Sequence, residues 1–71
     1  LPTAREHWHA AHALFVSLAE ACPSRRSLDD LADSLGRLAR IAHELGDDAE
    51  SLLWIERAEP VHRRLFELAP G

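Results

Sequence analysis

The stretch Leu35–Ala58, LGRLARIAHELGDDAESLLWIERA, decides the fold of this 71-residue chain. Apolar residues recur at spacings of three and four up to Leu45, which is the period of one helix face. Gly46 follows as a helix-terminating glycine, and Asp47 is a suitable cap for the next helix. A second apolar stripe with the same spacing begins at once. Because the connection is so short, the two helices are expected to lie side by side and antiparallel, as a helical hairpin.

A third helix precedes the hairpin, and local signals mark the ends of all three. Thr3, with Glu6 three residues later, predicts a capped start for the first helix, and Pro23 follows its end. Ser27 is the expected cap of the second helix. Pro60 lies inside the third helix and predicts a kink rather than an end, since the apolar stripe continues in phase beyond it. The sequence therefore predicts an all-α fold of three antiparallel helices, over about residues 3–22, 27–45 and 47–69.

Composition places residues 1–71 among small, single-domain helical proteins. Apolar residues make up 46 % of the chain, but a chain this short buries only about 60 % of its unfolded surface, so the core is marginal. The net charge is −4 and no basic cluster is present, which argues against nucleic acid as the main partner. No apolar run approaches the ~18 residues of a membrane span, so no membrane partner is expected either.

Cysteine usage bears on the cellular compartment of the protein, and arginine usage bears on the base composition of its genome. The single cysteine, Cys22, cannot form an internal disulfide, which favours a reducing compartment and a cytoplasmic location. All eight lysine-or-arginine positions are arginine, a bias typical of a GC-rich genome. The chain begins at Leu1 without a methionine, so we expect it to be a fragment of a longer protein.

The first helix also repeats the pattern of the third. An internal alignment lays Trp8 on Ile55 and Leu14 on Val61, and it keeps the apolar positions in phase along both helices. The first helix therefore looks like the second helix of a preceding hairpin whose first half is missing.

These residues resemble the tetratricopeptide (TPR) repeat family. The resemblance is carried by Leu38-Ala39, Ala42, the Gly46 turn, Ser51, Ile55 and Ala58, and in the first helix by Ala4, Trp8 and Ala11. The chain departs from the family pattern at Ala42, where the family has a large aromatic residue, and at Ser51, where it has alanine. The repeat is longer than the usual ~34 residues and is more similar to the elongated repeats of bacterial multidomain regulators. A generic three-helix bundle is the alternative architecture.

In TPR proteins the first helix of each hairpin lines a groove that takes peptides or partner helices. The resemblance therefore implies a non-enzymatic scaffold for protein–protein interaction, in a cytoplasmic bacterial regulator or a stack of repeats. Beside Gly36, the groove-facing positions carry Asp33, Arg37, Arg40, His43 and Glu44. Guanidinium groups match carboxylates through paired hydrogen bonds, so a carboxylate-bearing partner is expected. The alternative is a solvated face on which Asp33–Arg37 and Arg40–Glu44 form ordinary i,i+4 ion pairs.

Histidines near the N-terminus offer the remaining chemistry. His9 and His12 share a helix face at a spacing that can ligate a transition metal, while His7 points elsewhere. Two ligands do not complete a site, so His9 and His12 are weak metal candidates and no cofactor is expected. No serine or cysteine has a partnered base and acid, and the three glycines are too scattered to form a phosphate loop. We therefore expect no catalytic residues.

Two functions compete with a TPR-like scaffold. One is a small helical bundle that binds a metal through His9 and His12. The other is a helical homodimerisation element, in which an exposed apolar stripe pairs with a second copy. Trp8 and Trp54 both lie on apolar stripes, and we expect both in the core.

Overall fold

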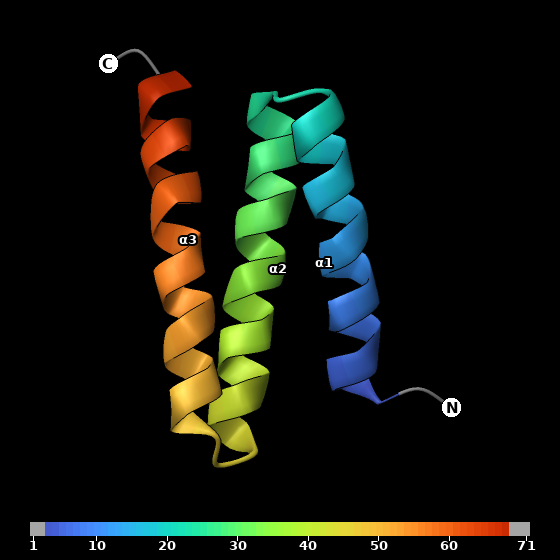
Figure 1. The fold of residues 1–71 in the computed structure, drawn as a ribbon, viewed down its shortest axis with the longest axis vertical. Helices are drawn as coiled ribbons and strands as arrows, with labels where there is room; N and C mark the ends of the chain where they lie inside the picture. The colour runs from blue at the N-terminus through green and yellow to red at the C-terminus, as the bar shows by residue number, and fades with distance from the viewer. Residues whose placement is uncertain (1–2, 69–71) are drawn as a thin grey trace.

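The computed structural model describes residues 3–68, which form three helices joined by short loops (Figure 1). α1 spans Ala4–Ala21, α2 spans Arg25–Glu44 and α3 spans Asp48–Leu68. The predicted all-α fold of three antiparallel helices is confirmed, and residues 3–68 contain no strand. The predicted end of the third helix at residue 69 lies outside the described residues. None of these helices is long and apolar enough to cross a membrane.

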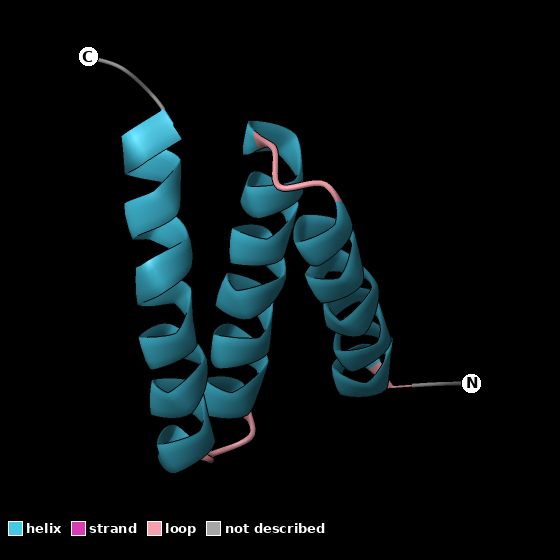
Figure 2. Cartoon of the chain, turned by 45° about the horizontal axis from the view of Figure 1, so that its top comes forward, coloured by secondary structure: helices cyan, strands magenta, loops and turns pink. Residues whose placement is uncertain are grey.

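α2 is the central helix of the structure. α1 and α3 both pack against α2, one on each side, and their own backbones do not come into contact (Figures 1 and 2). The resulting molecule is a flat layer that measures 37 × 23 × 15 Å. One face of α2 is enclosed by its neighbours in this layer, and the opposite face remains open to solvent.

The core is centred on the enclosed face of α2. Leu28, Leu35 and Leu38 are at most 2 % exposed, and burial of each leucine side chain contributes about 1.5–3 kcal/mol. The other core residues are Leu31, Ala39 and Ala42 of α2, Ala19 of α1, and Trp54, Ala58 and Val61 of α3. Trp8 is half-buried and packs against this core. Trp54 is thus in the core as expected, and Trp8 lies at its edge.

The start of α2 differs from the prediction, because Ser24 rather than Ser27 is its cap. The Ser24 hydroxyl accepts from the amide of Ser27 at 3.2 Å, and the Ser27 hydroxyl accepts from the amide of Ser24 at 2.9 Å. This reciprocal capping box moves the start of the helix to Arg25. The α1 cap is as predicted, since the Thr3 hydroxyl accepts from the amide of Glu6 at 3.1 Å.

Gly46 closes the tight connection between α2 and α3. Its φ of +84° lies in the left-handed region, where glycine is favoured because it has no Cβ. The Gly46 amide donates to the carbonyl of His43, and the Asp47 amide donates to the carbonyl of Ala42. The Asp47 carboxylate then accepts from the amide of Glu50 at 3.0 Å and caps α3 as predicted.

Two features of α3 bear on the sequence interpretation. The helix continues through Pro60 to Leu68, as the phase of its apolar stripe indicated. Ser51, which stands where TPR repeats have alanine, is buried and donates to the carbonyl of Ala39 in α2 at 2.8 Å. The small side chain allows close approach of the two helices, and its hydroxyl is satisfied across the interface.

The burial pattern corrects the register of the internal repeat. Laying Trp8 on Ile55 pairs a residue that packs against the core with one that is 56 % exposed. A register one residue shorter pairs Trp8 with Trp54 and Phe15 with Val61, and these four side chains all pack in or against the core. α1 and α3 are therefore similar in the way they dock on α2, but the repeat is one residue shorter than the sequence suggested.

Replacing Leu35 with alanine tests the central position of α2. Because Leu35 is 2 % exposed, Leu35→Ala should lower the free energy of unfolding by about 2–5 kcal/mol in a urea titration. Leu14→Ala is the matched control, since Leu14 is 66 % exposed and its change should stay within about 0.5 kcal/mol. Equal losses from the two variants would contradict the burial of the α2 face.

Candidate interaction surface

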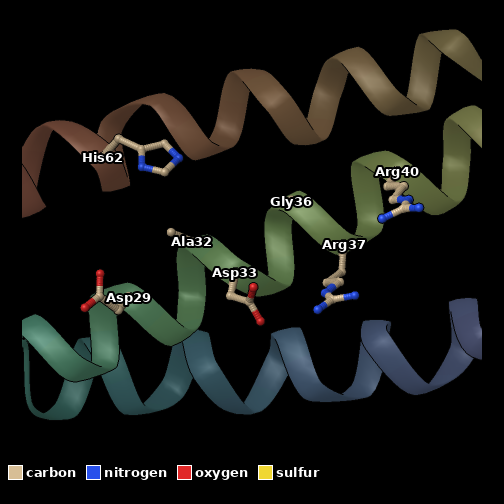
Figure 3. A pocket seen from close by; sticks show the side chains of 7 residues that line it. All are labelled: Asp29, Ala32, Asp33, Gly36, Arg37, Arg40 and His62. Carbon is tan, nitrogen blue, oxygen red and sulfur yellow. The ribbon is translucent and has the colours of Figure 1, made fainter.

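The open face of α2 carries a shallow hollow lined mainly by charged residues. The hollow has a volume of about 540 Å³. It is lined by Asp29, Ala32, Asp33, Gly36, Arg37 and Arg40 of α2, and by His62 of α3. His62 points from α3 toward α2, whereas Asp33 and Arg37 project on the side of α2 nearer α1 (Figure 3). The hollow therefore spans the width of α2.

The structure brings only part of the predicted site together. Asp33, Arg37 and Arg40 line the hollow, while His43 and Glu44 lie nearer the α2–α3 turn and are not among its lining residues. His43 Nδ1 instead lies 3.1 Å from the carboxylate of Asp48, and both side chains are exposed. Asp29 and His62 also line the hollow but are not predicted from the sequence, and they differ in whether the sequence could have indicated them. Asp29 lies one turn before Asp33 and shares its face, so the helix period indicates it, but His62 depends on how α3 is placed.

Arg37 is held by an aromatic ring and not by the predicted carboxylate. The predicted Asp33–Arg37 pair is not formed, and the Arg37 guanidinium carbon lies 5.6 Å from the centroid of the Trp8 ring. No carboxylate within residues 3–68 lies at ion-pair distance from Arg37. The guanidinium is thus positioned by Trp8, and its N–H donors remain available to a ligand.

Arg40 carries the one predicted ion pair that is formed at this surface. Its Nε donates to Glu44 Oε1 at 3.0 Å, with the two side chains 75 % and 61 % exposed. An exposed i,i+4 pair of this kind contributes only about 0.3–0.5 kcal/mol. Arg40 can therefore exchange Glu44 for another carboxylate at small cost.

Gly36 forms the floor of the hollow between its acidic and basic ends. The sequence suggested a close approach by another backbone or a ligand at this mid-helix glycine. Apart from its chain neighbours and the local helix backbone, no atom of residues 3–68 lies within 4 Å of a Cβ built at Gly36, so no other backbone in this part of the chain approaches there. The space above Gly36 is open, with Asp29 and Asp33 on one side along the helix and Arg37 and Arg40 on the other.

The predicted metal candidates lie in a different cluster, which joins α1 to α3. The rings of His9 and His12 both pack edge-on against Trp54, with centroids 5.3 Å apart in each case. Arg5 donates to both carboxylate oxygens of Glu50 at 3.0 Å, and His9 Nε2 lies 3.7 Å from Glu50 Oε1. Side chains thereby connect two helices whose backbones do not touch.

The His12 side chain packs at the edge of the core, and its hydrogen bond to Ser34 determines its tautomer. Its Nδ1 lies 3.2 Å from the hydroxyl of the buried Ser34. That hydroxyl donates its only proton to the carbonyl of Leu31 at 2.7 Å, so Nδ1 of His12 must be the donor. Over residues 3–68, no group of three or more histidine, cysteine, aspartate or glutamate side chains is arranged to hold a metal ion. The geometry of His9 and His12 is that of packed side chains.

No protein-family model, curated protein or solved structure matches this chain. The TPR resemblance therefore stays a prediction, and the functional argument depends on the geometry of the hollow.

The His12 cluster predicts how stability depends on pH. Burial, followed by the charges of Arg57 and His9, lowers the pKa of His12 from its ordinary 6.5. The unfolded chain then binds the proton more readily than the folded chain, so the free energy of unfolding should fall as pH drops below 6.5 and level off below the folded-state pKa. Urea titrations at several pH values should show a smaller decline for His12→Gln than for wild type. An unchanged slope in His12→Gln would contradict the assignment.

Gly36 offers a test of the open floor. Because a methyl group meets no other atom there, Gly36→Ala should raise the free energy of unfolding by roughly 0.8–1.0 kcal/mol, through its higher helix propensity. Gly46→Ala is the control, since its positive φ predicts a loss of about 1 kcal/mol from the same change. Destabilisation by Gly36→Ala would show that something in the chain occupies the hollow.

Proposed function

We propose that this chain is a non-enzymatic, TPR-like interaction module that binds a protein or peptide partner on the open face of α2. The observation that carries the proposal is Arg37, whose guanidinium carbon lies over the Trp8 ring, 5.6 Å from its centroid, and which has no carboxylate partner within residues 3–68. The three-helix arrangement supports it, because α1 and α3 cover one face of α2 and leave the other to solvent.

The charges around the hollow favour a carboxylate-bearing partner. Arg37 and Arg40 are less than one helical turn apart, and a guanidinium binds a carboxylate through two parallel hydrogen bonds. The cation–π contact with Trp8 restricts the Arg37 side chain before binding, which reduces the conformational entropy lost on binding. Asp29 and Asp33 lie toward the start of α2. A partner that places a carboxylate near Arg37 and Arg40 and a hydrogen-bond donor near Asp29 and Asp33 fits both ends of the hollow.

The TPR resemblance extends the proposal to a cytoplasmic bacterial regulator that contains further repeats. The sequence on either side of these residues tests that extension directly. Further helical hairpins in the flanking sequence would support a stack of repeats, whereas an unrelated flanking sequence would favour an independent three-helix module.

A peptide library tests the role of Arg37. Short peptides with a free carboxyl terminus should shift the NMR resonances of residues around the hollow, and the same peptides with an amidated terminus should bind less. Arg37→Ala should weaken binding of the selected peptide by about tenfold to a hundredfold, because charged hydrogen bonds contribute about 1.5–3 kcal/mol. Arg37→Lys should restore only part of the affinity, since a lysine lacks the planar fork.

Arg64→Ala is the matched control, because Arg64 is an exposed arginine on α3 outside the hollow. Its affinity for the selected peptide should equal that of wild type. Equal losses from Arg37→Ala and Arg64→Ala, or resonance shifts confined to other surfaces, would disprove the proposal.

A further inference from the structure

The outer flank of α3 exposes a row of apolar side chains that the proposed function does not use. We define the α3 stripe as Leu52, Ile55, Glu59 and Phe66, whose spacing places them along one side of the helix. Leu52, Ile55 and Phe66 are 55 %, 56 % and 82 % exposed. A phenylalanine that exposed, in line with two other apolar side chains, marks a surface suited to burial against a partner.

The surface area of the chain is large enough to accommodate such a partner. Its accessible surface is 5164 Å², whereas a compact monomer of 7.9 kDa exposes about 4,400 Å². The excess of about 750 Å² is close to the ~800 Å² that each partner buries in an interface of standard size. The whole molecule therefore exposes more surface than a compact monomer of its mass, by about the area that one partner buries in a stable dimer.

We propose that the α3 stripe pairs with the α3 stripe of a second copy, in an antiparallel dimer with two-fold symmetry. A two-fold interface requires a surface that is complementary to itself. With the axis near Glu59, Leu52 of one copy lies opposite Phe66 of the other, because both are two helical turns from the centre. The apolar ends of the two stripes then cover each other.

The charges beside the stripe favour this orientation. Glu56 lies before the centre of the stripe and Arg63 lies after it, so antiparallel pairing brings Glu56 of each copy close to Arg63 of the other. The two Glu59 side chains meet near the axis, but each is already paired with Arg63 of its own helix, Nη2 to Oε1 at 3.1 Å. Parallel pairing would instead place Glu56 beside Glu56.

A second apolar flank on α1 supplies the main competing arrangement. Leu14 and Leu18 are 66 % and 54 % exposed. Packing of this flank on the α3 stripe of another copy would be head-to-tail, and a contact of that kind produces rings or open chains of subunits and no two-fold dimer. The self-complementary charges of α3 favour the closed dimer.

The oligomeric state of the full chain in solution tests the pairing. Sedimentation equilibrium should give a mass twice the 7.9 kDa of the chain, and Leu52→Ser/Phe66→Ser should reduce it to the monomer mass. Leu14→Ser/Leu18→Ser is the matched control, which should remain dimeric. All four side chains are exposed, and circular dichroism checks that each variant keeps its helical content.

Charge reversal tests the antiparallel register. Glu56→Arg alone and Arg63→Glu alone should each weaken the dimer by roughly tenfold, since each homodimer then contains two like-charge contacts. An equimolar mixture of the two variants should dimerise more tightly than either variant alone, because the heterodimer restores two opposite-charge contacts, although Glu59 of the Arg63→Glu chain still lacks its own partner. A wild-type chain that stays monomeric, a mass that grows without limit, or a mixture no tighter than the single variants would overturn the proposal.

Discussion

Enclosure of one face of α2 by two flanking helices is the constraint on which this structure depends. A chain of this size has few residues with which to build a core, and the four buried leucines of residues 3–68 all lie on one helix. α1 and α3 therefore both pack against the same apolar face of α2, and each covers part of it. Because both flanking helices are used on that face, the other side of α2 is left uncovered, and its polar residues become the accessible surface.

The sequence predicts the elements of this fold better than their contacts. Apolar spacing gives three helices, and Gly46 and Asp47 give the turn, because these signals act within a few residues. Ser24 and Ser27 both suit a helix cap, and only their reciprocal hydrogen bonds decide between them. The predicted alignment of the first helix with the third is wrong by one residue. A one-residue shift still keeps the apolar positions of the two helices roughly in phase, whereas the burial of the side chains distinguishes the two alignments.

In the candidate site too, the sequence predicts which residues share a helix face but not which residues of other helices they contact. The polar face of α2 follows from the helix period, so Asp33, Arg37 and Arg40 are found from the sequence. The contact of Arg37 with Trp8 and the position of His62 depend on how neighbouring helices dock, which i,i+4 spacing does not encode. The same applies to His9 and His12. Their spacing suits a metal, but the placement of α3 turns both rings onto Trp54.

Trp8 takes part both in the packing of α1 on the core and in the contact with Arg37 on the open face of α2. Its ring belongs to the contact of α1 with the core and also lies beneath the guanidinium of Arg37. A ligand that reorients Arg37 must then change the free energy with which α1 docks on α2. Thermodynamic linkage is reciprocal, so the factor by which a ligand would change the docking equilibrium of α1 equals the factor by which docking of α1 would change ligand affinity. Under the proposed function, attachment of α1 at the edge of the layer would therefore influence ligand binding on the adjoining open face of α2.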